Sequence, residues 1–327
     1  MHLFAEATTN FTLELYRQLR ETEDNIFYSP VSIMTALAML QLGAKGNTRQ
    51  QIEKEFLEDI KKFYHANVES LDFAHAADES QKKINSWVES QTNGKIKDLF
   101  PDGSLGSDTR LVLVNAVYFK GQWDHKFDEK HTGEENFWLN KNTRKPVQMM
   151  KQRSKFNFNL LEDVQAKIVE IPYKSKELSM FILLPDEIDG LKELEDKLTA
   201  DKLIEWTSPQ NMDMIELYLS LPRFRVEQKY DLPDPLKHMG MVDAFNTQKA
   251  DFSGMSSKEG LVVSKVLHKS FVEVTEEGTE AAAATGVEVA LTSALISEDF
   301  SCDHPFLFFI KQNKTNSILF FGRMSSP

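Results

Sequence analysis

The chain has 327 residues, 41% of them apolar, and a formal net charge of −12 with an isoelectric point near 5.2. This apolar content is sufficient for a substantial core, and an acidic chain without a dense Lys/Arg cluster is not expected to bind nucleic acid. A single cysteine, Cys302, excludes an internal disulfide and is typical of a reducing compartment.

The N-terminal residues 1–18 lack a basic stretch followed by an apolar one, so no secretory signal peptide is expected. No apolar run is long enough to span a membrane. Sequons at Asn10 and Asn313 are interpreted as chance matches in that setting. We therefore expect a cytoplasmic, globular monomer without a membrane partner, and release from cells without a signal peptide stays open.

The first third of the chain predicts helices. An apolar stripe with residues four apart predicts a helix over residues 5–20. Ser29 and Pro30 form an N-cap and first-turn pair for a second helix, apolar nearly all round, that Gly43 ends.

Three further elements follow in this region. A capping-box match at Thr48 predicts a helix that continues to about Tyr64. Residues 68–74 are expected to form a short strand, and Asp78 is expected to cap an amphipathic helix that ends at Gly94.

The middle of the chain changes to strand patterns. The run LVLVNAVYFKGQW, residues 111–123, predicts a central strand covered on both faces. Asn115 within it must find a hydrogen-bond partner if it is buried. Short strands alternating with turns are expected over residues 137–185, and surface helices at 191–198 and 201–206.

The last third predicts strands at 214–230, a short helix at 232–241 and a hairpin of two apolar strands at 304–324. Helices come mostly early and strands mostly late. The economical interpretation is one α+β domain, residues 1–327, built on large mixed sheets.

Between two apolar strands at 261–274 and 304–310 lies a run of small residues. Alanines 281–284 alone favour a short helix. However, the odd-numbered residues of 279–291 are small or apolar, whereas the even-numbered ones are small or charged. A period of two is typical of a strand with one buried face. The segment is therefore compatible with an exposed loop and with a sheet strand. We infer that the function of the protein depends on the ability of this segment to adopt either structure.

Motifs spread over nearly the whole chain carry a family resemblance. They are NIFYSPVSI (25–33), LGAKGNT (42–48), INSWVESQTNGKI (84–96), LVLVNAVYFKGQW (111–123), EIPYK (170–174), LSMFILLP (178–185), LPRF (221–224), VLHKSFVEVTEEGTEAAAAT (266–285), HPFLFFI (304–310) and SILFFGR (317–323). In this order they resemble the serpin family, within it the intracellular ovalbumin-type branch and most nearly the squamous cell carcinoma antigens. The resemblance implies a serpin fold, with helices packed around large mixed sheets and a reactive loop at about 278–297.

The resemblance also implies an activity. Serpins of this kind are protease inhibitors and not enzymes, and the implied partner is a target protease of the cysteine (papain- or cathepsin-like) or serine (chymotrypsin-like) class. The protease cleaves the loop, stays covalently attached and is distorted as the loop inserts into the main sheet. Strand addition and loop insertion are general switching devices. No cofactor and no metal are implied.

Three groups of residues match functional positions of the family. The hinge of inhibitory members corresponds to Glu276, Glu277, Gly278, Thr279, Glu280, Ala281, Ala282, Ala283, Ala284 and Thr285. The region where the sheet opens corresponds to Ser29, Ser32, Asn115, Trp123 and His268. The reactive bond corresponds to Thr292–Ser293, with Leu291–Thr292 as the alternative.

The choice of bond bears on the target. Cleavage after Thr292 places Leu291 where papain-like proteases prefer an apolar residue, and cleavage after Leu291 suits chymotrypsin-like proteases. No Arg or Lys lies between residues 281 and 299, which disfavours trypsin-like targets.

Simpler interpretations compete with these assignments. His268 and Asn115 could be two separately satisfied polar groups of the core. Cys302 with His304 lacks the accompanying ligands of a metal site or the partners of a thiol nucleophile, and a small residue at a strand edge is the favoured interpretation.

The chain departs from the family pattern at one place. At the 54/55 junction the family ordinarily inserts the end of one helix, a further helix and an edge strand of the main sheet, whereas QQIEK runs directly into EFLED here. This departure supports a second hypothesis, a serpin-fold protein that no longer inhibits and acts as a protease substrate or binding partner.

The hinge assignment makes a first prediction. Ala283→Arg should turn an inhibitor into a substrate, because a strand that enters a packed sheet must fit beneath side chains already there. The measurement is the yield of covalent complex on a denaturing gel. An undiminished yield would refute the hinge assignment.

Overall fold

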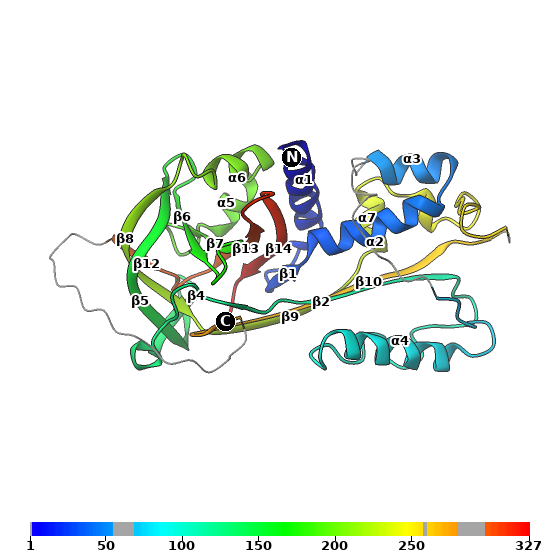
Figure 1. The fold of residues 1–327 in the computed structure, drawn as a ribbon, viewed down its shortest axis with the longest axis horizontal. Helices are drawn as coiled ribbons and strands as arrows, with labels where there is room; N and C mark the ends of the chain where they lie inside the picture. The colour runs from blue at the N-terminus through cyan, green and yellow to red at the C-terminus, as the bar shows by residue number, and fades with distance from the viewer. Residues whose placement is uncertain (1, 55–68, 258–259, 280–297) are drawn as a thin grey trace. The chain divides into compact units, whose positions relative to one another are not determined.

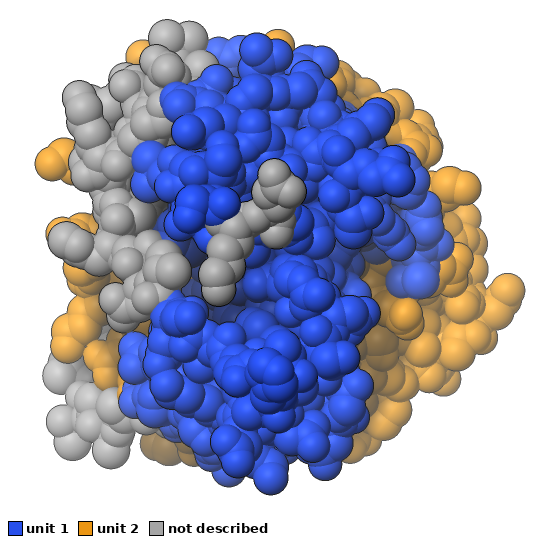
Figure 2. Space-filling view, turned by 90° about the vertical axis from the view of Figure 1, so that its right-hand side faces the viewer, with its two compact units in different colours: residues 1–22, 28–118, 227–271 blue, residues 23–27, 119–226, 272–327 orange. Residues whose placement is uncertain are grey.

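The structure is a computed structural model, and it describes residues 2–54, 69–257, 260–279 and 298–327 (Figure 1). Its internal contacts divide the chain into two compact units, coloured separately in Figure 2. Unit 1 comprises residues 1–22, 28–118 and 227–271, and unit 2 comprises residues 23–27, 119–226 and 272–327. None of the described helices is long and apolar enough to cross a membrane.

Unit 1 places helices on both sides of two parallel strands. In Figure 1, α2, α3 and α7 lie on one side of β2 and β10, and α4 lies on the other. The elements of this unit are α1 (His2–Leu19), α2 (Pro30–Gly43), α3 (Gly46–Lys54), α4 (Ala77–Gln91), β2 (Leu111–Tyr118), α7 (Pro233–His238), the 3-10 turn η3 (Asp243–Phe245) and the part of β10 (Val263–Thr275) up to Phe271.

Helix α2 confirms the predicted N-cap. The Ser29 hydroxyl accepts a hydrogen bond from the Ser32 amide at 3.2 Å, and Pro30 stands in the first turn. The helix was expected to end at Leu42 and includes one more residue, Gly43. The Ala44 amide closes its last turn by donating to the Leu40 carbonyl at 3.0 Å. Helix α1 also forms, over nearly the predicted range.

The capping-box prediction at Thr48 is wrong, because α3 begins at Gly46. The Thr48 hydroxyl is used in tertiary contacts, donating to the Lys249 carbonyl at 3.4 Å and accepting from the Asp251 amide at 3.0 Å. The expected continuation to Tyr64 lies outside the described residues, which resume at residue 69.

The strand predicted over 68–74 is wrong for the described part of that range. Residues 73–75 form a turn, and the Asp72 carboxylate accepts a hydrogen bond from the His75 amide at 3.1 Å. A side chain that binds its own backbone in this way favours a turn over a strand. Helix α4 then begins at Ala77, so Asp78 lies in its first turn and not at its cap.

Strand β2 is only partly as predicted. Within the described residues it pairs with β10 alone, so there it is an edge strand and not a central one. Leu113 is its one buried residue, and the others are half-buried. Helices α2 and α4 do flank its two faces, which explains why the strand is apolar except at Asn115.

Unit 2 is dominated by a large sheet. Its strands run in the order β1-β14-β13-β7-β6-β5-β8-β12, and β4 pairs with β5. The bounds are β1 (Ile26–Tyr28), β4 (Gly133–Asn140), β5 (Thr143–Leu161), β6 (Ala166–Pro172), β7 (Leu178–Pro185), β8 (Asp213–Pro222), β12 (Glu298–Ser301), β13 (Phe306–Gln312) and β14 (Ser317–Met324). The expected hairpin is confirmed as β13 and β14, and two short strands expected separately are joined in β5.

Further elements complete the chain. They are β3 (Gly121–Gln122), the 3-10 turn η2 (Glu129–His131), α5 (Leu191–Lys197), α6 (Ala200–Trp206), β9 (Phe224–Asp231) and β11 (Gly278–Thr279). The surface helices and strands predicted between residues 137 and 231 are confirmed in type. Aromatic side chains fill the core of unit 2, as in the stacked pair Phe27 and Phe320 with ring centroids 5.3 Å apart.

Candidate functional site

Strand β10 carries the residues that the sequence analysis singled out. In unit 1 it pairs with β2 in parallel, from Val263 opposite Leu111 to Phe271 opposite Tyr118. In the same register His268 lies directly opposite Asn115. The pairing brings two polar side chains, 153 positions apart in the chain, onto one row of the sheet.

A polar cluster lies at this row. The side-chain Nδ2 of Asn115 donates to the Ser32 carbonyl at 2.9 Å and to the Ser32 hydroxyl at 2.6 Å. The Ser29 amide donates to Nε2 of His268 at 3.0 Å, and Nδ1 of His268 hydrogen-bonds the Asn115 side-chain oxygen. The four predicted residues of unit 1 thus form one network. The simpler interpretation, two separately satisfied groups, is wrong.

These partners define the state of His268. Because Nε2 accepts from the Ser29 amide, the ring proton is on Nδ1, where it is donated to Asn115. The side chain is fully buried, and burial lowers the pKa of His268 from 6.5 to about 3. A second proton on Nε2 would also point at the Ser29 N–H. His268 is therefore neutral at physiological pH.

The opposite face of the two strands packs against α4. Leu267 and Phe271 of β10 form an apolar cluster with Ile84 and Val88 of α4. Val114 of β2 is partly buried against the same cluster. The two strands are therefore held by an apolar contact on one face and by the polar cluster on the other.

In unit 2 the chain turns back on itself at the end of β10. Val274 pairs with Thr279 and Thr275 with Gly278, so β11 runs antiparallel to β10. On its other edge Gly278 pairs with Gln122 of β3. The two described residues of β11 thus lie between β10 and β3 as the beginning of an additional strand.

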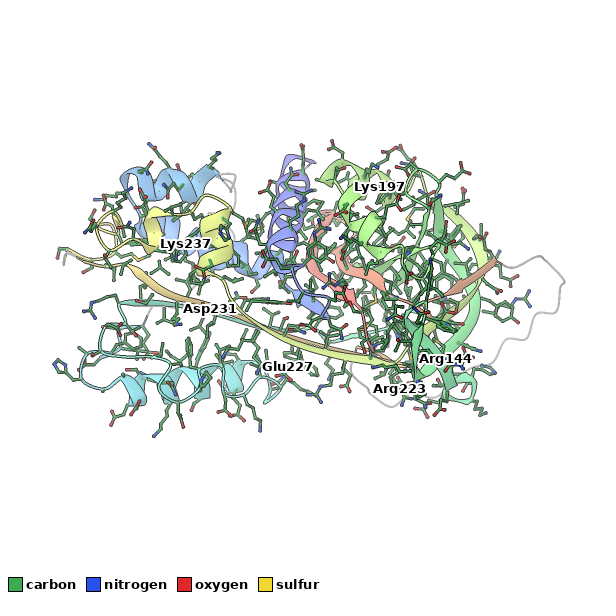
Figure 3. All side chains as sticks on the ribbon, turned by 180° about the vertical axis from the view of Figure 1, so that it is seen from behind. Arg144, Lys197, Arg223, Glu227, Asp231 and Lys237 are labelled. Atoms are coloured by element: carbon green, nitrogen blue, oxygen red, sulfur yellow. The ribbon has the colours of Figure 1, made fainter. Side chains whose placement is uncertain are left out.

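Glu276 holds this turn in place. Its carboxylate accepts hydrogen bonds from Nε of Arg223 at 3.1 Å and from Thr132 at 2.7 Å. Burial by itself would raise the pKa of Glu276, but these hydrogen bonds outweigh it and leave the pKa below its usual value. Beside it, Lys126 pairs with Glu277. Arg223, labelled in Figure 3, comes from the start of the segment that leads into β9.

Trp123 closes the same region. Its ring is buried and stacks on Tyr173, with centroids 4.6 Å apart, and its Nε1–H donates to the Thr275 carbonyl at 2.9 Å. Its backbone amide donates to the Glu277 carbonyl at 3.1 Å. The predicted role of Trp123 at the sheet opening stays a prediction, but the residue does contact the turn that starts the loop.

Gly278 has a backbone conformation that only glycine adopts readily. Its φ is +134°, and an added Cβ would lie 2.2 Å from the Gly121 carbonyl oxygen and 2.7 Å from Cα of Gln122. Any other residue at position 278 would therefore have both a steric clash at its Cβ and an unfavourable φ angle.

The other predicted loop residues fall outside the described part of the chain. These are Glu280, Ala281, Ala282, Ala283, Ala284 and Thr285 of the hinge, and Leu291, Thr292 and Ser293 at the reactive bond. Sequence reasoning missed Arg223, Thr132 and Tyr173, which support Glu276 and Trp123. Arg223 does lie in the LPRF motif, which was a signal of its importance, whereas no pattern marks Thr132.

Cys302 and His304 do not act together. Cys302 is fully buried, and burial raises the pKa of its thiol well above its usual value. His304 directs Nε2 at the Pro185 carbonyl, 2.6 Å away, and Nδ1 at Asp303, 2.8 Å away. Within the described ranges, no group of three or more His, Cys, Asp or Glu residues could hold a metal ion.

Comparison with known families identifies the family of this chain. The family model described as Serpin (serine protease inhibitor) matches residues 6–56 and 51–327. The chain belongs to the serpin family. This result confirms the resemblance drawn from the sequence motifs, including the ovalbumin-type branch.

Curated relatives are similar over their whole length. The chain is 55% identical to human serpin B4 over 391 positions and 54% identical to human serpin B3 over 392, in each case covering 100% of both chains. It is 44% identical to human leukocyte elastase inhibitor, again with 100% coverage of both. The alignment with serpin B4 has 391 positions and this chain has 327 residues, so 64 positions have no residue here.

Solved structures share the fold. Uncleaved ovalbumin superimposes with a TM-score of 0.90 at 35% identity, covering 99% of this chain and 100% of that chain. A loop-inserted structure of a cleaved ovalbumin mutant gives 0.85 at 32% identity, with the same coverage.

The buried His268 predicts a pH dependence of stability. The His268 side chain binds its proton near pH 6.5 in the unfolded state and only near pH 3 in the folded state. Between these two values the unfolded state binds more protons, so the free energy of unfolding decreases as the pH is lowered. From pH 7 to pH 5 the wild type should lose about 2 kcal/mol more than His268→Gln. Urea unfolding at each pH measures this difference. Parallel curves of stability against pH for the two proteins, or an NMR signal of the His268 imidazole that titrates above pH 5, would contradict the prediction.

Gly278 allows a matched substitution test. Gly278→Ala should destabilise unit 2 by about 2–3 kcal/mol, since it adds a backbone clash to an unfavourable φ. Gly103→Ala is the control, because Gly103 also has a positive φ, +76°, but nothing within 4 Å of an added Cβ. The control should cost about 1 kcal/mol. Equal midpoints of urea unfolding for the two variants would show that the Gly278 contact is unimportant.

Proposed function

We propose that this chain inhibits proteases by presenting residues 278–297 as bait and inserting the cleaved loop as a strand beside β10. The pairing of β11 with β10 carries the proposal, because it supplies the direction and the register for such a strand. The relatives named as leukocyte elastase inhibitor and as members of the serpin family support inhibition as the activity.

The register makes a specific assignment. Val274 pairs with Thr279 and Thr275 with Gly278. Continuing the same antiparallel count would set Ala281 opposite Val272, Ala283 opposite Ser270 and Thr285 opposite His268. The three β10 residues are fully buried. Residues directly opposite in an antiparallel pair share a face of the sheet, so the inserted side chains at these positions must be small.

The alternate positions would face the other side of the sheet. There the same count sets Glu288 opposite Lys265, an oppositely charged pair, and Glu280 opposite Glu273, a like-charged one. The odd-numbered loop residues, which the period-two pattern marks as small or apolar, are therefore the same residues whose side chains this register would place on the buried side of the sheet.

Insertion requires β2 and β10 to separate. Their ladder hydrogen bonds would be replaced by two new ladders, one on each side of the inserted strand, each bond contributing about 0.5–1.5 kcal/mol net. We place the opening at the polar cluster of Ser29, Ser32, Asn115 and His268. Separation would remove Asn115 as acceptor for His268, and the hydroxyl of Thr285, opposite His268 in the register, could take its place.

The target protease is of the cysteine papain-like or the serine chymotrypsin-like class. Cleavage at Thr292–Ser293 favours the first and cleavage at Leu291–Thr292 the second. The mechanism requires no catalytic group of this chain, since the attacking nucleophile belongs to the protease.

A second candidate function follows from the edge position of β2. The family model matches in two pieces that meet at residues 51–56, and 64 positions of the serpin B4 alignment have no residue here. Both findings support a missing family segment at the 54/55 junction. A sheet that lacks a strand beside β2 could fail to retain an inserted strand. The chain would then be a protease substrate or a binding partner.

Cleavage with a cathepsin L-like and a chymotrypsin-like protease separates the two functions. An inhibitor should form a complex that survives a denaturing gel, and its cleaved form should melt more than about 10 °C above the intact one, because a dozen added ladder bonds stabilise it. Mass spectrometry of the cleaved chain identifies the bond. Complete cleavage without complex and without a gain in melting temperature would leave only the second function.

A further inference from the structure

The outer face of strand β8 is unusual for its exposed apolar and aromatic side chains. Met214 is 61% exposed and Tyr218 is 48% exposed, although both lie on a strand that is paired on both sides, with β5 and with β12. On the inner face of the same strand Leu217 and Leu219 are fully buried. The alternation shows that the exposed residues belong to the solvent side.

Neighbouring strands extend this face. Arg153 of β5 lies opposite Tyr218 on one side, and Asp299 of β12 lies opposite Tyr218 on the other. The Arg153 guanidinium stands over the Tyr218 ring, 5.5 Å from its centroid, and donates to the Glu216 carboxylate at 3.1 Å. We call Arg153, Met214, Glu216, Tyr218 and Asp299 the β8 platform.

The platform is a prepared surface. The guanidinium is held by both the ring and the carboxylate, so little side-chain freedom remains to be lost on binding. Tyr and Arg are the residue types that most often dominate binding energy in protein interfaces, and Met is enriched there.

Chain connectivity indicates what covers the platform. Strand β12 begins at Glu298, only five residues after Ser293. A fully extended chain of five residues spans at most about 18 Å. A protease domain of about 220 residues has a radius of gyration of about 17 Å. A protease that attacks the proposed bond is therefore held within reach of the start of β12 and of the row of Asp299 and Tyr218.

We propose that the β8 platform is a second contact surface for the protease that attacks the loop, in addition to the loop itself. The inference rests on the proposed function, because it takes the protease as the occupant. It goes further in assigning part of the recognition to Tyr218, Arg153 and Met214. The platform would raise the rate at which the protease engages this chain, whereas the loop sequence alone sets the cleaved bond.

The test compares Tyr218→Ala and Arg153→Ala with the wild-type chain. We expect the second-order rate of loop attack by the cathepsin L-like or chymotrypsin-like protease to fall at least fivefold in each variant. The protease should cleave a synthetic peptide of residues 284–297 at its ordinary rate, and the melting temperature of each variant should match the wild type.

Leu160→Ala is the matched control. Leu160 is also 48% exposed and lies on β5, but its place in the strand alternation sets it on the opposite face from Arg153. This variant should react at the wild-type rate. A twofold or smaller effect of Tyr218→Ala, or an equal loss in Leu160→Ala, would overturn the platform and leave the proposed inhibition intact.

The proposed function fails in a different way. If the wild-type chain is cleaved in the loop without forming a covalent complex, and cleavage still depends on Tyr218, inhibition is refuted while the platform stands as a substrate-recognition surface. If neither protease attacks the loop at all, the platform inference is overturned together with the function.

Discussion

The pairing between β2 and β10 is the contact on which the proposed mechanism depends. It is stabilised by ladder hydrogen bonds, by the apolar cluster facing α4 and by the network of Asn115 and His268. A strand can enter beside β10 only when all three are exchanged for equivalent contacts. Buried polar groups are costly when they lose their partners. In the proposed mechanism the polar cluster would therefore set a barrier to opening and at the same time a requirement on the inserted strand.

The beginning of the loop is held much more firmly than an exposed connection needs to be. Glu276 is almost fully buried and accepts hydrogen bonds from Arg223 and Thr132, and Trp123 donates to the neighbouring carbonyl. If the loop inserts as proposed, a fixed starting point with a defined strand direction would reduce the conformations that must be searched. Gly278 permits the backbone to pass close to Gly121 as it leaves this anchor.

The position of β2 links the fold to the two candidate functions. The chain has the two strands between which the proposed insertion would occur, and the polar network lies at their pairing. What differs from the curated relatives is the number of alignment positions filled, and the described part of the sheet ends at β2. Retention of an inserted strand depends on how well β2 is supported. Helix α4 provides support on one face and α2 on the other.

Patterns in the chain identified most elements and the family, because periodicity, caps and motifs are local properties. Ser29 with Pro30 marked α2, and the apolar runs marked β13 and β14. The hinge assigned from the motif around His268 stays a prediction. Local signals failed where distant residues compete for the same groups. Thr48 binds the 249–251 backbone and does not cap α3. At Asp72 another local signal prevailed, because its carboxylate binds the His75 amide and makes a turn where a strand was expected. The pairing of Asn115 with His268, the anchoring of Glu276 by Arg223 and the edge position of β2 arise from strand register and packing between segments far apart in the chain, and no local pattern encodes those.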